Sequence, residues 1–199
     1  MLYLVQVRIT PGPPVTVHAP YHPNWPGKAR SLGGQWDAAS RTWKFDPRDL
    51  ERVRAALGAV YGWTGDYPVE ILDARVLLDK VPSDGDALWM FGRLLAERRG
   101  RDAPVRLGQG VVLFCGGFPL SGGSRRSPRL EPYPGTTLEV RDVCATIFEA
   151  HRQEWPEGIF EVPGSRRTLS GPGQEPMQAG FSEATRWPKR RIILEDGED

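Results

Sequence analysis

Alternating apolar and polar residues open the chain and predict two short strands. Residues 3–9 follow the period-two pattern of a half-buried strand, and Val15–Ala19 repeat it after the turn TPGPP. A hairpin is predicted further on, with strands over residues 34–37 and 41–45 and a polar turn between them. These segments predict a small antiparallel sheet.

Helix signals interleave with these strands. Asn24 is the predicted cap of a short helix that runs to Ser31 and ends at Gly33. A second helix is predicted from the cap Asp46 and Pro47 onward, with Asp49 completing a pair like a capping box. Its apolar stripe has helical spacing and Gly62 ends it; the stripe is Leu50, Val53, Ala56, Leu57 and Val60. Residues 1–66 are therefore predicted to form a β-β-α-β-β-α module.

The rest of the chain is predicted to be mostly β. A long strand over Val69–Leu78, interrupted near Asp73, and a buried strand over Val111–Cys115 are expected. Residues 84–99 fit either a helix face or a strand alternation. Strand residues 136–140 precede a helix that Asp142 is expected to cap.

This second unit is predicted to span residues 67–152. Residues 153–199 form a predicted Pro/Gly-rich, poorly structured extension, in which 163–176 read as a flexible linker. One strand at Ile192–Leu194 and an acidic end close the chain. The predicted fold class is α+β.

The composition is typical of a chain with many turns, and the overall net charge does not indicate binding to a polyanion. The chain has 23 glycines and 19 prolines among 199 residues and a formal net charge of +1. Residues 1–66 carry eight Lys/Arg against five Asp/Glu, so any affinity for a polyanion must come from a local patch. Such a patch is expected on the hairpin module.

The hairpin offers both a core and a basic surface. Trp36, Trp43 and Phe45 are expected to lie together beneath the helix stripe. Gln35, Lys44 and the head of Arg41 are then left near the exposed side. Lys28 and Arg30 come from the preceding helix, and Arg48, Arg52 and Arg54 from the next one. Arginine and lysine in this arrangement can meet phosphates.

The segment VTVHAPYHPNWPGKARSLGGQWDAASRTWKFDPRDLERVRAAL, residues 15–57, resembles the HARP domain of annealing helicases and related small modules of bacterial, plasmid and phage proteins. The shared pattern is a short helix, G-x-W-D, a turn, R-x-W-x-F and a helix. The resemblance implies binding of branched or partly single-stranded DNA. The chain has no phosphate-binding loop of the G-x-x-x-x-G-K-[ST] type, so only passive binding is expected.

A second candidate site is the loop FCGGFPLSGGSRRSPR, residues 114–129. Its glycines would let backbone N–H groups approach an anion, although the composition fits a flexible surface loop better than a specific nucleotide site. Contact with a nucleic-acid backbone is the function expected of Arg125, Arg126 and Arg129. The C-terminal TRWPKRR could stack on bases and neutralise phosphate.

Other chemistry is not indicated by the sequence. The three histidines and two separated cysteines lack metal-ligand spacing, and no nucleophile elbow or acid–base pair is visible. We therefore expect no metal, no cofactor and no catalytic residue, although catalysis by groups distant in sequence stays open. No apolar run reaches the roughly 18 residues of a membrane span, and the cysteine usage favours a cytoplasmic protein.

Three functions remain in competition. The first is a nucleic-acid-binding accessory factor of DNA processing or of a mobile element, with DNA favoured over RNA. Its expected contacts are Lys28, Arg30, Gln35, Trp36, Arg41, Trp43, Lys44, Arg125, Arg126 and Arg129. The second is a protein-interaction or structural accessory protein of a phage or plasmid, and the third is an enzyme that uses the glycine-rich loop. Oligomeric state is not predicted.

Overall fold

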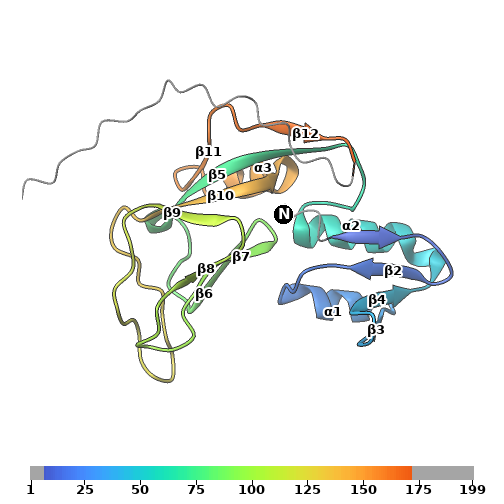
Figure 1. Ribbon diagram of the computed structural model, residues 1–199, viewed down its shortest axis with the longest axis horizontal. Coiled ribbons are helices and arrows are strands. Elements are labelled where there is room, and N and C mark those ends of the chain that lie inside the picture. The colour runs from blue at the N-terminus through green and yellow to red at the C-terminus, as the bar shows by residue number, and fades with distance from the viewer. Residues whose placement is uncertain (1–6, 172–199) are drawn as a thin grey trace, which may run out of the picture.

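The structure is a computed structural model and describes residues 7–171. It contains helices and several antiparallel sheets, which confirms the α+β class. Figure 1 shows the chain passing from the N-terminal sheet and helices to a larger, mostly β part. The strand expected at residues 192–194 and the TRWPKRR segment lie outside the described residues.

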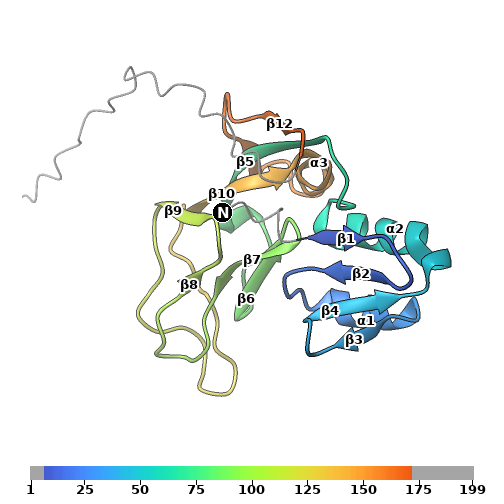
Figure 2. The same cartoon turned by 45° about the vertical axis from the view of Figure 1, so that its right-hand side comes forward.

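A four-stranded antiparallel sheet forms the N-terminal part. Its strands are β1 (Arg8–Thr10), β2 (Val15–His18), β3 (Gln35–Asp37) and β4 (Thr42–Phe45), in the spatial order β1-β2-β4-β3. Figure 2 shows the four strands side by side in this order. One face is buried through Val15, Val17, Trp43 and Phe45. Strand β3 lies at the edge of the sheet, with no further strand of residues 7–171 beyond it.

Helices α1 (Asn24–Ser31) and α2 (Leu50–Tyr61) pack on the buried face of this sheet. The short 3-10 helix η2 (Pro47–Asp49) precedes α2, and Asp46 caps it by accepting the Arg48 N–H at 2.9 Å. Gly62 ends α2 with φ 74°, as expected. Asn24 is not a cap: it is the first residue of α1, and its N–H donates to Nδ1 of His22.

A three-stranded sheet resolves the ambiguity of residues 84–99 in favour of strands. It consists of β6 (Ala87–Met90), β7 (Arg93–Glu97) and β8 (Arg106–Leu107) in sequential order. Phe91 and Gly92 form the β6–β7 turn, both with positive φ. A Cβ at Gly92 would lie 2.6 Å from Cα of Tyr61, so this turn sits directly against the end of α2.

The largest sheet runs in the order β11-β5-β10-β9. Its strands are β5 (Val69–Leu77), followed by the 3-10 helix η3 (Leu78–Lys80), then β9 (Val111–Cys115), β10 (Thr137–Cys144) and β11 (Ile159–Glu161). The predicted break at Asp73 appears instead as a register shift in β10 between Val140 and Val143. Asp142 lies in this bulge with φ 55° and pairs with Arg167, so it does not cap the following helix α3 (Ala145–Glu154).

The predicted boundary at residue 153 is wrong. Helix α3 extends to Glu154, and both β11 and β12 (Arg167–Leu169) pair with β5. Arg167 anchors the latter strand through the Asp73 and Asp142 carboxylates, and Ser165 donates to the Val162 carbonyl at 2.7 Å. Composition suggested a linker because proline, glycine and polar residues dominate the segment. The structure holds it to the sheet through the buried Leu169 and through the polar contacts of Ser165 and Arg167.

Strand β9 was expected to be buried, but only Val111 is. Among the described strands, β9 pairs only with β10 and lies at an edge of the sheet, and residues 112–115 are exposed. The Arg75 guanidinium lies 3.7 Å from the Phe114 ring centroid. The apolar sequence predicted the strand but not its place at an edge.

One continuous hydrophobic core joins the N-terminal part to the β-rich part. Gly62 illustrates the closeness of the junction, because a Cβ there would lie 2.3 Å from Cβ of Ile147 in α3. Within residues 7–171, no helix has both the length and the apolar character needed to cross a membrane.

Candidate binding site

A pocket of about 370 Å³ opens beside α1 and the β3–β4 hairpin. This volume is near the lower end of small-molecule sites, which span roughly 300–1,000 Å³. Aromatic rings from three segments dominate its walls. The lining residues are Ala19, Pro20, Tyr21, His22, Trp25, Pro26, Arg30, Trp36 and Trp43. We call this the aromatic pocket.

Trp36 and Trp43 face each other across the hairpin with ring centroids 5.4 Å apart. Trp43 is 6% exposed and belongs to the core, as predicted. Trp36 is 51% exposed and does not lie beneath the α2 stripe, which corrects the expectation that both rings are core. Because β3 is an edge strand, no strand of residues 7–171 covers the outer side of the Trp36 ring.

The other rings come from the segment YHPNWP before and within α1. Tyr21 is 72% exposed at the rim, whereas Trp25 is 2% exposed and packs against Phe45 and Tyr61. The indole N–H of Trp25 is buried and has no hydrogen-bond acceptor among the described residues. A buried donor without an acceptor is uncommon in proteins.

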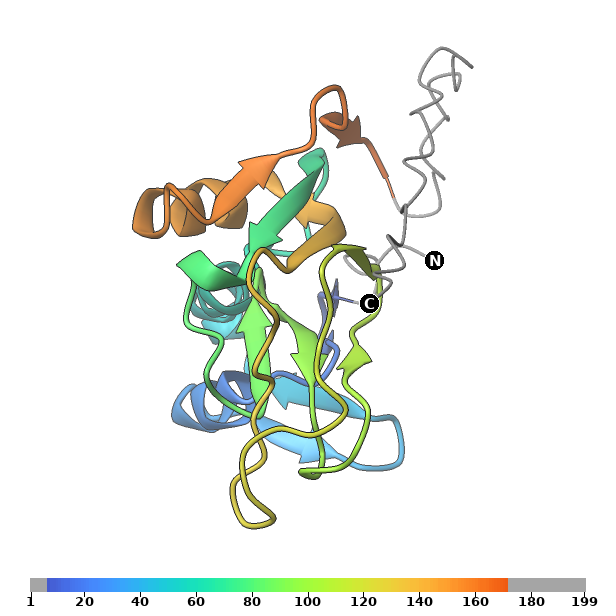
Figure 3. The same cartoon turned by 90° about the vertical axis from the view of Figure 1, so that its left-hand side faces the viewer.

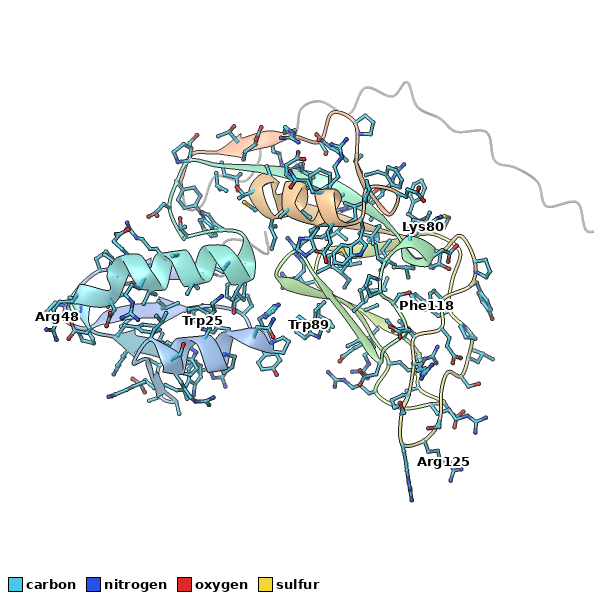
Figure 4. The ribbon with its side chains drawn as sticks, turned by 180° about the vertical axis from the view of Figure 1, so that it is seen from behind. Trp25, Arg48, Lys80, Trp89, Phe118 and Arg125 are labelled. Carbon is cyan, nitrogen blue, oxygen red and sulfur yellow. The ribbon has the colours of Figure 1, made fainter. Side chains whose placement is uncertain are left out.

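Trp89 of β6 joins this aromatic group from the β-rich part of the chain. Its ring lies 5.2 Å from that of His22 and 6.0 Å from that of Tyr21, both with edge-to-face geometry. Figure 4 shows Trp89 between the two parts of the molecule, on the side that faces Trp25. The position of Tyr21 and His22 therefore depends on both parts.

His22 is a neutral hydrogen-bond donor at this site. Burial lowers its pKa below the ordinary value of 6.5, so the ring is uncharged at neutral pH. Nδ1 accepts the Asn24 N–H at 3.2 Å, which leaves the ring proton on Nε2. The arrangement fixes the tautomer and places an N–H group on a residue that lines the aromatic pocket.

The charge at the aromatic pocket is positive. The Arg30 guanidinium lies 5.7 Å from the Trp43 ring centroid, within the range of a cation–π contact. No Asp or Glu lines the pocket. Lys28, on the same helix, is exposed, and no carboxylate of residues 7–171 lies within 4.0 Å of either cation.

The protein's own carboxylates neutralise most of the other predicted cations of this module, Arg41 excepted. The Lys44 ammonium lies 2.7 Å from an Asp37 oxygen, and this contact lowers the pKa of Asp37. The remaining pairs join Arg48 to Asp46, Arg52 to Asp49, and Arg54 to both Glu51 and Asp66. The broad cationic face expected from the sequence is therefore absent from the described part of the module.

Gln35 and Arg41 lie apart from the aromatic pocket. Gln35 is the cross-strand neighbour of Lys44, so both project from the sheet face opposite the helices. Arg41 ends the hairpin turn with φ 54° and is exposed, with no ion pair within the described range. The structure thus gathers only Arg30, Trp36 and Trp43 of the predicted residues in one pocket, with Lys28 on the adjoining helix.

The glycine-rich loop has a structural explanation. Arg98 is 1% exposed and donates to the carbonyl oxygens of Arg101, Ala103, Pro119, Leu120 and Leu130. A Cβ at Gly122 would lie 2.3 Å from the Arg129 carbonyl oxygen and 3.2 Å from Nε of Arg98. The loop is therefore built around a buried guanidinium, and this glycine allows the close approach. Figure 3 shows residues 116–136 in yellow, extending away from the large sheet.

Arg125, Arg126 and Arg129 are exposed on this loop, and none has an ion pair with a residue in the range 7–171. Arg125 lies far from Trp25 in Figure 4, so the loop and the aromatic pocket do not form one site. Arg129 borders a second pocket that also contains Asp79, Asp84 and Glu131, a lining that disfavours an anion.

The chain matches no protein-family model, no curated protein and no solved structure. The geometry must therefore carry the functional argument. In the part of the chain from 7 to 171, no group of three or more His, Cys, Asp or Glu side chains is placed to hold a metal ion.

The sequence reasoning missed Tyr21, Trp25 and Trp89 as site residues. A usable signal was present for two of them: Tyr21, His22 and Trp25 stand among three prolines within the seven residues from Pro20 to Pro26. Prolines restrict the backbone and aromatic rings supply flat walls. Trp89 gave no such signal, because its approach to His22 depends on the packing of distant segments.

Proposed function

We propose that this protein binds nucleic acid through its N-terminal part, with single-stranded or branched DNA as the preferred form, and acts as a non-catalytic accessory factor. The observation that carries the proposal is Trp36, a half-exposed indole at the rim of an aromatic pocket that contains Arg30 and no carboxylate. Exposed aromatic rings beside unpaired cations are the usual elements of single-strand binding.

The resemblance of residues 15–57 to the HARP domain favours DNA over RNA and supports the same region. Its G-x-W-D and R-x-W-x-F motifs supply Trp36 and Trp43, two walls of the aromatic pocket. The role in DNA processing or in a mobile element, and a cytoplasmic location, belong to this proposal and rest on the resemblance and the composition.

The proposed interface is smaller than the sequence suggested. Lys28, Arg30 and Arg41 are the module cations without an ion pair to a described residue. Three phosphate contacts give a salt slope of about −2 on single strands. Arg125 and Arg126 would steepen the slope only if the strand also reached their loop.

Fluorescence anisotropy with labelled single strands, duplexes and forks over a range of salt concentrations tests the proposal. We expect binding at low ionic strength, weaker at high salt, with single strands or forks preferred over blunt duplexes. Lys28→Gln combined with Arg30→Gln should reduce affinity by about tenfold, whereas Arg48→Gln, a cation already paired with Asp46, should not. Lack of binding to every form at low salt would refute the proposal.

A protein partner is the second candidate function, and β9 favours it. Val112, Leu113 and Phe114 are exposed on an edge strand that pairs on one side only. Such an edge can accept a strand from another protein. If Leu113→Lys abolishes co-purification of a partner while DNA binding is absent, this function replaces the first.

A further inference from the structure

We propose that the aromatic pocket holds one unpaired base of a nucleic-acid strand. The inference rests on the proposed function for the strand that delivers the base, and it adds a defined subsite. Four observations lead to it: ring geometry, charge, hydrogen-bonding groups and support from the β-rich part.

The first observation concerns shape. Rings of Tyr21, His22, Trp25, Trp36 and Trp43 line about 370 Å³, and the outer rings are the exposed ones. Flat aromatic walls suit a planar ligand, because every base has a π-face that stacks on indole or phenol. Trp36 and Tyr21 at the rim can contact an entering ring before it reaches the buried walls.

The second observation concerns charge. Aromatic cages also bind quaternary ammonium groups, and such sites must attract a cation. Here Arg30 lies within the lining and no carboxylate does, so the electrostatic field opposes a cationic ligand. The same guanidinium attracts the phosphate attached to a base. A nucleotide therefore fits the pocket better than a methylated amine.

The third observation concerns hydrogen bonding. His22 and Trp25 both line the pocket; His22 carries its ring proton on Nε2, and the indole N–H of Trp25 has no acceptor among the described residues. The Pro20 carbonyl oxygen already accepts the Tyr61 hydroxyl at 2.7 Å. Every base can accept a hydrogen bond, through a carbonyl oxygen in thymine, cytosine and guanine and through ring nitrogens in adenine. We therefore expect the pocket to hold a base without a strong preference among the four.

The fourth observation is that the pocket is supported from outside the module. Trp89 packs edge to face on both Tyr21 and His22, and these residues also depend on the Pro20–Tyr61 hydrogen bond. This support restricts the loop before α1 without closing the pocket. A site held by two parts of the chain is better positioned than one on a free loop.

The test uses labelled oligomers of about ten nucleotides, a length within the range of one single-strand site. One oligomer is entirely abasic, and two others carry a single central thymine or a single central adenine in the same abasic backbone. Charge and length are constant, and self-stacking of the strand is removed. Affinities are measured with the full chain at one low salt concentration.

We expect the thymine oligomer and the adenine oligomer each to bind roughly tenfold more tightly than the abasic one. Trp36→Ala and Tyr21→Ala, both at exposed positions, should bring both of these oligomers close to the abasic affinity. Tyr133→Ala, which removes a similarly exposed tyrosine elsewhere, is the matched control and should change nothing.

The outcomes separate the two proposals. If all three oligomers bind equally tightly at low salt, the base subsite is refuted and the proposed function stands. If both base-carrying oligomers bind more tightly than the abasic strand but Trp36→Ala and Tyr21→Ala leave that advantage unchanged, the base is held elsewhere and the subsite is refuted. If none of these oligomers and no natural-sequence strand binds at low salt, the proposed function itself fails.

Discussion

Asp37 and Lys44 form an ion pair of 2.7 Å across the β3–β4 hairpin, on the sheet face opposite the helices. The same carboxylate accepts the Ala39 N–H at 3.0 Å, so it serves the hairpin turn as well as the lysine. Lys44 was a leading candidate for phosphate contact in the sequence. Its charge is instead compensated locally, which moves the proposed interface to α1 and the exposed edge of the hairpin.

This ion pair leads to a first prediction. The double substitution Asp37→Asn with Lys44→Gln removes both charges and keeps an acceptor for the turn, so DNA affinity should stay within about twofold. Anisotropy at fixed salt measures it, with the Lys28→Gln and Arg30→Gln variant as the positive comparison. A loss as large as in that variant would place the interface on the outer sheet face.

Gly62 gives a second prediction, on stability. Alanine there combines a left-handed backbone with a Cβ only 2.3 Å from Ile147, so Gly62→Ala should lower the free energy of unfolding by about 3 kcal/mol. Gly33→Ala is the matched control, because φ is 77° there but no atom lies within 4 Å of the added Cβ. That variant should lose about 1 kcal/mol. Denaturant titrations compare them, and equal losses would contradict close packing at the junction.

Arg98 gives a third prediction. Removing the guanidinium leaves several carbonyl oxygens of the glycine-rich loop without a donor, so Arg98→Met should lower the free energy of unfolding by about 3 kcal/mol. Limited proteolysis should then cut within residues 99–130. The neighbouring Arg99→Met, at an exposed position, should change stability by less than about 0.5 kcal/mol. A stable, protease-resistant Arg98→Met protein would show that the loop does not depend on this residue.

A fourth prediction concerns pH. Burial lowers the pKa of His22 in the folded protein, whereas in the unfolded chain it stays near 6.5. Between these two values the unfolded state binds more protons, so stability should fall as pH decreases below about 6.5. Chemical denaturation between about pH 7.5 and 5.5 measures the slope. In His22→Phe the slope should be smaller, and an unchanged slope would assign it to other groups.

Local sequence signals predicted much of the N-terminal part because its structure is set by nearby residues. Asp46, the apolar stripe of α2 and Gly62 each act on residues close to them in sequence, and all three take the expected roles. Asn24 was misassigned because capping there comes from the His22 ring, which general propensities do not include. Trp36 was assigned to the core because alternation gives the face of a strand but not its position at the sheet edge.

Predictions failed more often where distant segments determine the structure. Asp142 looked like a helix cap, but its partner Arg167 lies 25 residues later. Val111–Cys115 looked buried because its composition is apolar, whereas its exposure follows from the strand order. The aromatic pocket likewise combines α1, the hairpin and a ring from β6. Pairing across such separations leaves no pattern in a short window of sequence.

Strand β5 has a consequence for how the chain acquires its structure. Val69 and Ile71 pair with Leu169 and Arg167, so the large sheet is completed only by residues nearly a hundred positions later. The N-terminal part has contacts of much shorter range and can form first during synthesis. The chain must emerge from the ribosome to a point well past Leu169 before β5 can pair with β12, its last neighbouring strand. Until then that edge of the strand is open to pairing with other nascent chains, so we expect the interval between the synthesis of β5 and that of β12 to be sensitive to aggregation.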